Sequence, residues 1–85
     1  MKYLSSKKFD RNFGKLPKKI KEQCIKRMEI FIQNPFDPIL NNHRLTGGYE
    51  NYRSINITGD IRAIYEPGDE LALFVRIGSH SELYK

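Results

Sequence analysis

The sequence of 85 residues has a single cysteine and no long apolar run. Because Cys24 stands alone, an internal disulfide is impossible and a zinc site built from several cysteines is excluded. No segment approaches the roughly 20 consecutive apolar residues that a membrane span requires, and the N-terminus lacks the apolar core of a secretion signal. We therefore expect a cytoplasmic protein without a membrane partner.

The compact motifs of several enzyme classes are also absent. The sequence contains no glycine-rich phosphate loop, no Ser-His-Asp arrangement and neither the HxH nor the HExxH spacing of metal-binding histidines. No metal site and no cofactor is therefore expected.

Basic residues outnumber acidic ones by 15 to 10, which gives a formal net charge of +5. Ten of the cations lie between Lys2 and Arg27. This imbalance indicates a surface that attracts nucleic acid, anionic lipid or an acidic protein, although the same lysines could simply form the solvated face of a helix. The hydrophobic content of 39% is typical of a globular protein, and the length suits one domain over residues 1–85.

Apolar residues recur every three or four positions in two successive N-terminal segments, as they do on one face of a helix. The first segment follows Ser5-Ser6, which are favourable N-cap residues, and ends near Gly14. The second begins at Pro17 and ends at Asn34-Pro35. The apolar positions are Phe9, Phe13 and Leu16 in the first segment and Ile20, Cys24, Met28 and Phe31 in the second. We therefore predict two antiparallel helices.

Three strands are expected in the C-terminal half, after an ordered loop over residues 36–48. Residues 52–57, 61–65 and 70–77 are rich in β-prone side chains and are separated by short turns. Short turns force antiparallel pairing, and residues 1–4 could add an edge strand. The predicted fold class is α+β in the order β-α-α-β-β-β, with both helices on one face of a small antiparallel sheet and the other face uncovered.

Polar strand residues should gather on that uncovered face. Asn56 and Arg62 flank a turn that brings their strands to about 5 Å from each other; Asp60 lies at its tip, Arg76 near the end of the neighbouring strand and His80 just beyond. An imidazole, a carboxylate and a guanidinium suit acid–base chemistry on a phosphate ester, because one group takes a proton, another gives one and a fixed cation offsets phosphoryl charge.

Each of these residues also has an ordinary structural explanation. A surface histidine such as His80, or His43 in the preceding loop, is usually inert. Asp60 could serve only the turn, and Arg62 could pair with a nearby glutamate. Chemistry alone therefore indicates a basic domain with a polar face that could bind phosphate.

Three segments, taken in order and spacing, carry a resemblance to a known family. They are Leu45-Thr-Gly-Gly-Tyr-Glu-Asn-Tyr-Arg-Ser-Ile-Asn-Ile, Gly59-Asp-Ile-Arg-Ala-Ile-Tyr and Arg76-Ile-Gly-Ser-His-Ser-Glu-Leu-Tyr. Together they resemble the RelE/ParE superfamily of bacterial toxins, and most of all its YafQ-type branch, over nearly the whole chain. The resemblance implies the toxin of a type II toxin–antitoxin system. YafQ- and RelE-like members cut mRNA on the ribosome, whereas ParE-like members poison DNA gyrase.

The resemblance also implies roles for individual residues. His43, Asp60 and His80 match catalytic positions, and Arg62 matches the arginine of an Arg-x-x-Tyr strand. Tyr84 falls where the family keeps an aromatic residue, which could stack on a base beside the cleaved bond. Asn56 is a departure, because YafQ-type enzymes tend to have a histidine there, and an amide hydrogen-bonds but does not transfer a proton near neutral pH.

The implied activity is that of a metal-independent mRNA endoribonuclease. A base, either His43 or Asp60, draws the proton from an RNA 2′-hydroxyl, which attacks the adjacent phosphorus. Arg62 and Arg76 would stabilise the phosphoryl oxygens, and His80 would protonate the leaving oxygen. The expected partners are mRNA, the ribosome and an acidic antitoxin that folds as it wraps the basic domain. A ParE-like gyrase inhibitor and a non-catalytic basic binding module are the alternatives.

Overall fold

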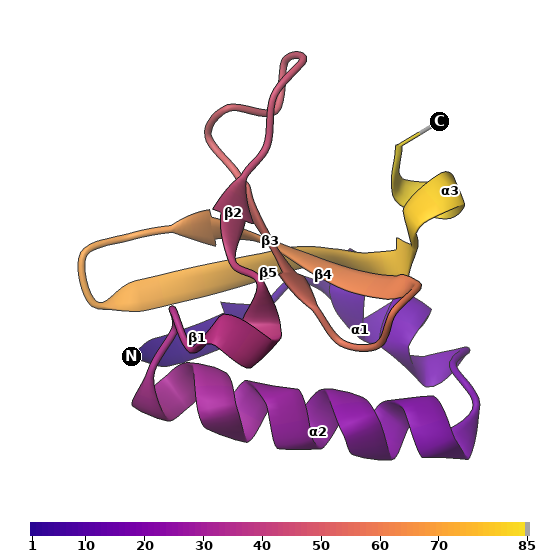
Figure 1. Cartoon of the computed structure of the whole chain (residues 1–85). Helices are drawn as coiled ribbons and strands as arrows, with labels where there is room; N and C mark the ends of the chain where they lie inside the picture. Colours follow the sequence, from indigo (N-terminus) through magenta and orange to yellow (C-terminus); the bar gives the residue numbers. More distant parts are fainter. Residues whose placement is uncertain (85) are drawn as a thin grey trace.

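The computed structural model describes residues 1–84, so the expected domain of residues 1–85 includes one residue, Lys85, that lies outside them. The chain forms a five-stranded sheet in the order β1-β5-β4-β3-β2, with the two longer helices beneath it (Figure 1). The elements are β1 (Lys2–Ser5), α1 (Lys7–Gly14), α2 (Lys18–Gln33), the 3₁₀ helix η1 (Pro38–Leu40), β2 (His43–Arg44), β3 (Arg53–Asn56), β4 (Ile61–Pro67), β5 (Leu71–Ser79) and α3 (His80–Leu83). Within residues 1–84, no helix has both the length and the apolar character needed to cross a membrane.

The helix boundaries follow the local signals in the sequence. Ser6 caps α1 and its hydroxyl accepts a hydrogen bond from the amide of Phe9 at 3.0 Å. Pro17 precedes α2, and Asn34 ends it in an extended conformation before Pro35. The predicted α+β fold, with two helices on one face of the sheet, is confirmed.

The sheet is mixed and not purely antiparallel, which corrects the prediction. β2, β3, β4 and β5 pair antiparallel, whereas β1 pairs parallel with β5. The amide of Ser6 donates to the carbonyl of Phe74 at 2.9 Å, and the Tyr3 and Phe74 rings pack edge to face with centroids 5.6 Å apart. Short turns predict pairing only between strands that follow one another in the sequence. They do not predict this pairing, because both helices and the other strands separate β1 from β5 in the chain.

The main core fills the space between the helices and the sheet. Phe31, Tyr65 and Phe74 meet at its centre, with ring centroids 5.1–5.2 Å apart. The buried members of this core are Phe9, Cys24, Met28, Phe31, Leu40, Ile55, Ile57, Ala63, Tyr65, Ala72, Phe74 and Ile77. Both predicted helical stripes and the inward faces of the three predicted strands contribute to it.

A second, smaller cluster lies on the opposite face of the sheet and corrects the expectation that this face is uncovered. Leu45, Ile64 and Leu83 are buried there, and Tyr52, Val75 and Tyr84 pack around them. Ile64 alternates with core residues along β4, so its side chain points away from the helices. The loop over residues 45–52 and the short helix α3 therefore cover part of this face (Figure 1).

A β-bulge interrupts β5 at Val75. Tyr65 is paired with Phe74, but the preceding residue Ile64 is paired with Arg76, so Val75 is an extra residue in the strand. Phe74 and Ile77 can consequently both face the main core although they are three positions apart. The bulge leaves Val75 and Arg76 together on the opposite face.

Candidate functional site

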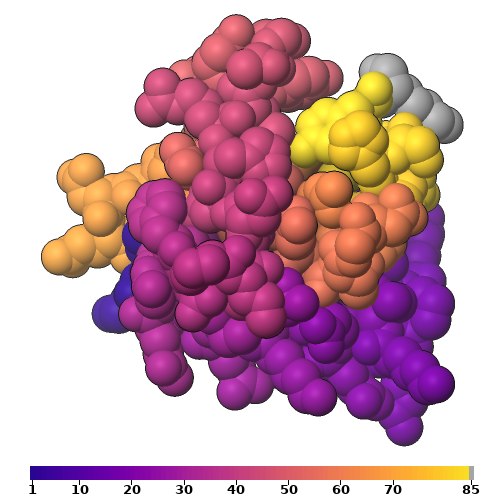
Figure 2. Space-filling view, in the orientation of Figure 1, coloured from indigo at the N-terminus to yellow at the C-terminus, as the bar shows by residue number. Residues whose placement is uncertain are grey.

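Four of the predicted site residues line one pocket at the end of the sheet. The pocket has a volume of about 260 Å³, and its walls come from β2 and the following loop, from β4 and from α3. It is lined by His43, Arg44, Leu45, Thr46, Arg62, His80 and Tyr84, and we call it the histidine pocket. Figure 2 shows its surroundings on one face of the molecule, with the loop after β2 in pink, the β3–β4 hairpin in orange and α3 in yellow.

The ring of His43 is oriented by a backbone carbonyl. His43 pairs with Ser54 in the sheet, and its Nδ1 lies 2.8 Å from the carbonyl oxygen of Asn41. A carbonyl oxygen only accepts, so Nδ1 carries the hydrogen, and Nε2 of the neutral ring keeps a lone pair. Asn41 has a positive φ of 46°, a conformation that asparagine tolerates better than most residues. This arrangement leaves Nε2 of His43 able to accept a proton.

His80 is held where β5 runs into α3. Ser79 and Glu82 form a capping box around the first turn of α3, so the helix begins at His80. The His80 amide donates to the carbonyl of Asp60 at 3.1 Å, which ties α3 to the β3–β4 turn. The rings of His80 and Tyr84 lie 4.6 Å apart between centroids at an angle of 50°. The turn thus holds the backbone of His80, and the ring of Tyr84 packs against its imidazole.

Arg62 supplies a guanidinium to the same pocket. It is paired with Asn56 on β3 and with Gly78 on β5, and its Nη1 donates to the carbonyl of Gly59 at 2.9 Å. Asn56 sits beside it but does not line the pocket. Its backbone carbonyl accepts from Arg27 at 3.2 Å, and its Oδ1 is buried without a hydrogen-bond partner among residues 1–84.

Asp60 lies at the edge of the histidine pocket and not inside it. The residue is exposed, and its carboxylate is not part of the pocket lining. Its backbone does contribute, because the carbonyl accepts from His80 while the amide donates to Thr58 Oγ1 at 3.2 Å. The contact that the structure shows between Asp60 and His80 therefore joins their backbones, and of the two residues only His80 lines the pocket.

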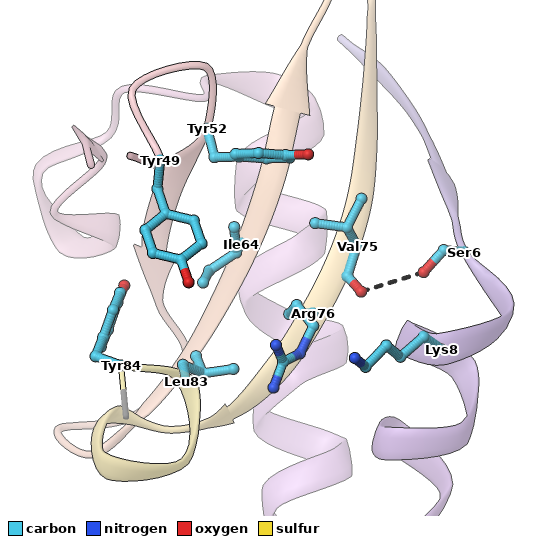
Figure 3. Close-up of a pocket in the computed structure, with 9 residues that line it drawn as sticks. All are labelled: Ser6, Lys8, Tyr49, Tyr52, Ile64, Val75, Arg76, Leu83 and Tyr84. Carbon is cyan, nitrogen blue, oxygen red and sulfur yellow. Dashed lines mark hydrogen bonds between the residues drawn. The ribbon is translucent and has the colours of Figure 1, made fainter. Parts of the chain in front are cut away.

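Arg76 lines a second pocket, of about 320 Å³, on the same face of the sheet (Figure 3). Tyr84 belongs to the walls of both pockets. The second pocket is lined by Ser6, Lys8, Tyr49, Tyr52, Ile64, Val75, Arg76, Leu83 and Tyr84, and we call it the tyrosine pocket. Arg62 and Arg76, which were predicted to act on one phosphoryl group, line different pockets that meet at Tyr84, and their joint role stays a prediction.

Sequence reasoning missed three members of the tyrosine pocket: Lys8, Tyr49 and Tyr52. Lys8 comes from the start of α1, which lies beside β5 because β1 pairs with that strand and Ser6 bonds to Val75. Tyr49 and Tyr52 follow the Gly47-Gly48 pair, where the backbone takes positive φ values of 69° and 97°. Two aromatic residues just after a glycine pair in a basic chain were a readable signal for a binding loop.

The charged side chains that line the two pockets are all positive. No aspartate or glutamate lines either of them, whereas Arg44 and Arg62 line one and Lys8 and Arg76 the other. Among residues 1–84 there is no group of three or more His, Cys, Asp or Glu side chains placed to hold a metal ion. The arrangement suits an anionic ligand.

Comparisons with known proteins agree with this architecture. The family model described as "Bacterial toxin of type II toxin-antitoxin system, YafQ" matches residues 1–85. A search of curated protein sequences gives no match.

Solved structures with the same fold include the crystal structure of YafQ from E. coli strain BL21(DE3), at 24% sequence identity and a TM-score of 0.83, covering 98% of this chain and 97% of that one. The E. coli DinJ-YafQ toxin-antitoxin complex matches at 23% identity and 0.77, covering 98% and 96%. A metal-bound toxin from Helicobacter pylori matches at 25% identity and 0.69, covering 99% of each chain. The resemblance seen in the sequence is thereby confirmed, and the chain belongs to the YafQ family of toxins of bacterial type II toxin-antitoxin systems.

Proposed function

We propose that this toxin is a ribosome-dependent mRNA endoribonuclease and that the histidine pocket is its active site. One observation carries the proposal: two histidines, one of them with Nδ1 held by a backbone carbonyl, line the same pocket as Arg62. Two imidazoles and a fixed cation are sufficient for cleavage through the RNA 2′-hydroxyl.

In the proposed mechanism, His43 Nε2 takes the proton of the 2′-hydroxyl as its oxygen attacks the adjacent phosphorus. Arg62 offsets the charge that develops on the non-bridging phosphoryl oxygens. His80, in its protonated form, gives a proton to the 5′-oxygen as the phosphorus–oxygen bond breaks. The products are a 2′,3′-cyclic phosphate and a 5′-hydroxyl, and DNA is not a substrate because it has no 2′-hydroxyl.

Asp60 and Asn56 have supporting roles in this scheme. Asp60 is the alternative base, but its carboxylate is outside the pocket lining, so we assign it the positioning of His80 through its carbonyl. Asn56 adjoins Arg62 and offers only hydrogen bonds to RNA, because an amide does not titrate near neutral pH. Both proton transfers therefore fall to the two histidines.

The basic surface supports two macromolecular partners. The cations of α1 and α2 would make the sequence-tolerant phosphate contacts that binding to ribosomal RNA requires. A toxin with net charge +5 also suits an acidic antitoxin. The structure of E. coli YafQ in complex with DinJ is a precedent for such an assembly.

The test is cleavage of translated mRNA by the variants His43→Ala and His80→Ala. Each should lose about 10²- to 10⁴-fold in rate, the usual effect of removing one acid or base. Asp60→Asn is the matched control, because it keeps the backbone carbonyl that binds His80, and it should stay within about tenfold of the wild type.

Near-normal cleavage by both histidine variants would refute the assignment. If Asp60→Asn lost as much activity as His43→Ala, the base would be Asp60. A ParE-like inhibitor would instead block gyrase supercoiling, and that block would survive His80→Ala.

A further inference from the structure

The side-chain amide of Asn42, the residue before His43, is held by three short hydrogen bonds. Its Nδ2 donates to the carbonyl of Pro35 at 2.8 Å and to the hydroxyl of Tyr65 at 2.7 Å. Its Oδ1 accepts from Nε of Arg53 at 2.7 Å. Both amide hydrogens and the amide oxygen are used, so the side chain has one favourable orientation. Asn42 does not line the histidine pocket, and the proposed mechanism does not use it.

Two of the three partners are rigid parts of the fold. Tyr65 is 2% exposed, and its ring packs edge to face against Phe31 with centroids 5.1 Å apart. Arg53 lies in β3 opposite Tyr65 in β4, and its guanidinium carbon lies 5.2 Å from the ring centroid of Phe36. The amide of Asn42 is thus bonded both to the centre of the main core and to the sheet.

Asn42 also lies between the imidazole of His43 and the carbonyl that binds it. That carbonyl belongs to Asn41, whose peptide bond leads directly into Asn42. Asn41 has a positive φ of 46°, and its amide donates to the carbonyl of Pro38 at 3.2 Å. The backbone of His43 is paired with Ser54 in β3. A rotation of the Asn42 backbone would therefore move the Asn41 carbonyl relative to the imidazole.

The position of that carbonyl decides which nitrogen of the neutral His43 ring carries the hydrogen. An unrestrained neutral histidine carries its hydrogen mostly on Nε2. The Asn41 carbonyl lies 2.8 Å from Nδ1 and so favours the other tautomer, in which Nε2 keeps a lone pair. Only in that tautomer is Nε2 able to take the proton of a 2′-hydroxyl.

We propose that Asn42 is a positioning residue for His43: its amide keeps the Asn41 carbonyl on Nδ1, and this leaves Nε2 free to act as the base. The inference rests on the proposed function for its effect on cleavage, whereas the tautomer of His43 is measured in the toxin without RNA. A residue with a purely structural role would lower the free energy of unfolding without selecting a tautomer.

The tautomer is read from the nitrogen chemical shifts of the ring. The chain has two histidines, so a toxin labelled with ¹⁵N-histidine shows two imidazoles by NMR. Spectra are recorded at about pH 8, where an ordinary imidazole is neutral. Asn42→Ala should raise the ratio of the Nε2–H to the Nδ1–H form of His43 about 2- to 10-fold, the factor that one hydrogen bond is worth. Tyr65→Phe removes one of the three bonds and should shift the ratio in the same direction by less.

Two controls separate positioning from a loss of stability. Met28→Ala opens a cavity in the main core and should lower the Tm without changing the tautomer of His43. The second imidazole, His80, is an internal control. It should keep its tautomer in Asn42→Ala, because α3 makes none of the three bonds to Asn42.

Cleavage of translated mRNA then tests the catalytic consequence. Asn42→Ala should lower kcat about 10- to 100-fold, because a misplaced base is costly. It should leave KM nearly unchanged, because Asn42 does not line the histidine pocket. In a His43→Ala background the same change should have no further effect, since a positioning residue acts only through the residue that it positions.

The inference is overturned if Asn42→Ala keeps the wild-type tautomer of His43, or if Met28→Ala shifts that tautomer equally. It is also overturned if Asn42→Ala lowers kcat as much in the His43→Ala background as in the wild type. Failure of the proposed function looks different: His43→Ala would cleave at a near-normal rate while Asn42→Ala still shifted the tautomer.

Discussion

Replacing Leu83 with alanine should disable the histidine pocket while leaving the main core intact. Leu83 is 7% exposed and packs with Leu45 and Ile64 in the second cluster. It is the only buried residue of α3, the four-residue helix that begins at His80. A helix of this length is not stable alone, so packing has to hold it in place.

The expected loss follows from the size of the cluster. Leucine-to-alanine changes in buried sites lose about 2–5 kcal/mol, and the loss is smaller where the site can collapse. The second cluster has three buried members and lies near the surface, so we expect about 2 kcal/mol. That amount shifts the ratio of detached to docked α3 by a factor of roughly 30. His80, the proposed proton donor, and the ring of Tyr84 would leave the pocket together.

The matched control is Leu40→Ala, which removes the same atoms from a fully buried position in the main core. We expect it to lower the free energy of unfolding by about 4 kcal/mol and the Tm by roughly 15–30 °C. Leu83→Ala should shift the Tm much less, yet it should speed hydrogen exchange at the Tyr84 amide, which bonds to the His80 carbonyl at 3.1 Å, and abolish most mRNA cleavage. If Leu83→Ala lowered the Tm as much as Leu40→Ala, or left exchange and cleavage unchanged, the two clusters would not be separable units.

Two further predictions concern the rest of the fold. Burial raises the pKa of the Cys24 thiol from 9.0 to about 11, so the folded protein holds this proton more tightly than the unfolded chain does. The free energy of unfolding should therefore fall as the pH rises from about 9 to 11, and urea titrations of Cys24→Ala across that range should lack this part of the fall; an equal pH dependence in both proteins would contradict the assignment. A Cβ at Gly68 would lie 2.6 Å from the carbonyl oxygen of Leu71, whereas one at Gly59 would have nothing within 4 Å. In urea titrations Gly68→Ala should thus lose about 1–3 kcal/mol and Gly59→Ala should stay within about 0.5 kcal/mol of the wild type; equal losses would show that the β4–β5 turn relaxes freely.

Local signals were enough to predict α1, α2 and the strands β3, β4 and β5. Helix spacing, the Ser6 cap and the proline positions act over a few residues, so the sequence shows them directly. The signal for α3 was equally local, because Ser79 and Glu82 have the spacing of a capping box, but it went unrecognised. β2 lies within residues 36–48, which were predicted to form a loop. Its two residues form a strand only by pairing with β3, and the local sequence does not show that pairing.

Part of the histidine pocket was predicted, some of its residues from the geometry of a short turn and others from the family resemblance. Arg62 and Asn56 were placed side by side because a short turn fixes their register. His43 and Tyr84 entered through the family resemblance, and both line the pocket with His80. Asp60 was expected to contribute a carboxylate, but a turn sequence does not determine where its side chain points.

Arg76 is the residue whose direction the alternation of side chains along a strand predicts wrongly. Strict alternation from Phe74 would place Arg76 in the main core and Ile77 outside it, the reverse of what the structure has. The extra residue Val75 restores Ile77 to the core and turns Arg76 outward. An unbulged strand would bury a guanidinium among Phe31, Phe74 and their neighbours, so the charge of Arg76 itself argues for the bulge. The same one-residue shift gives the tyrosine pocket one of its two cations, so the position of Arg76 depends on a feature of β5 that hydrophobic periodicity does not reveal.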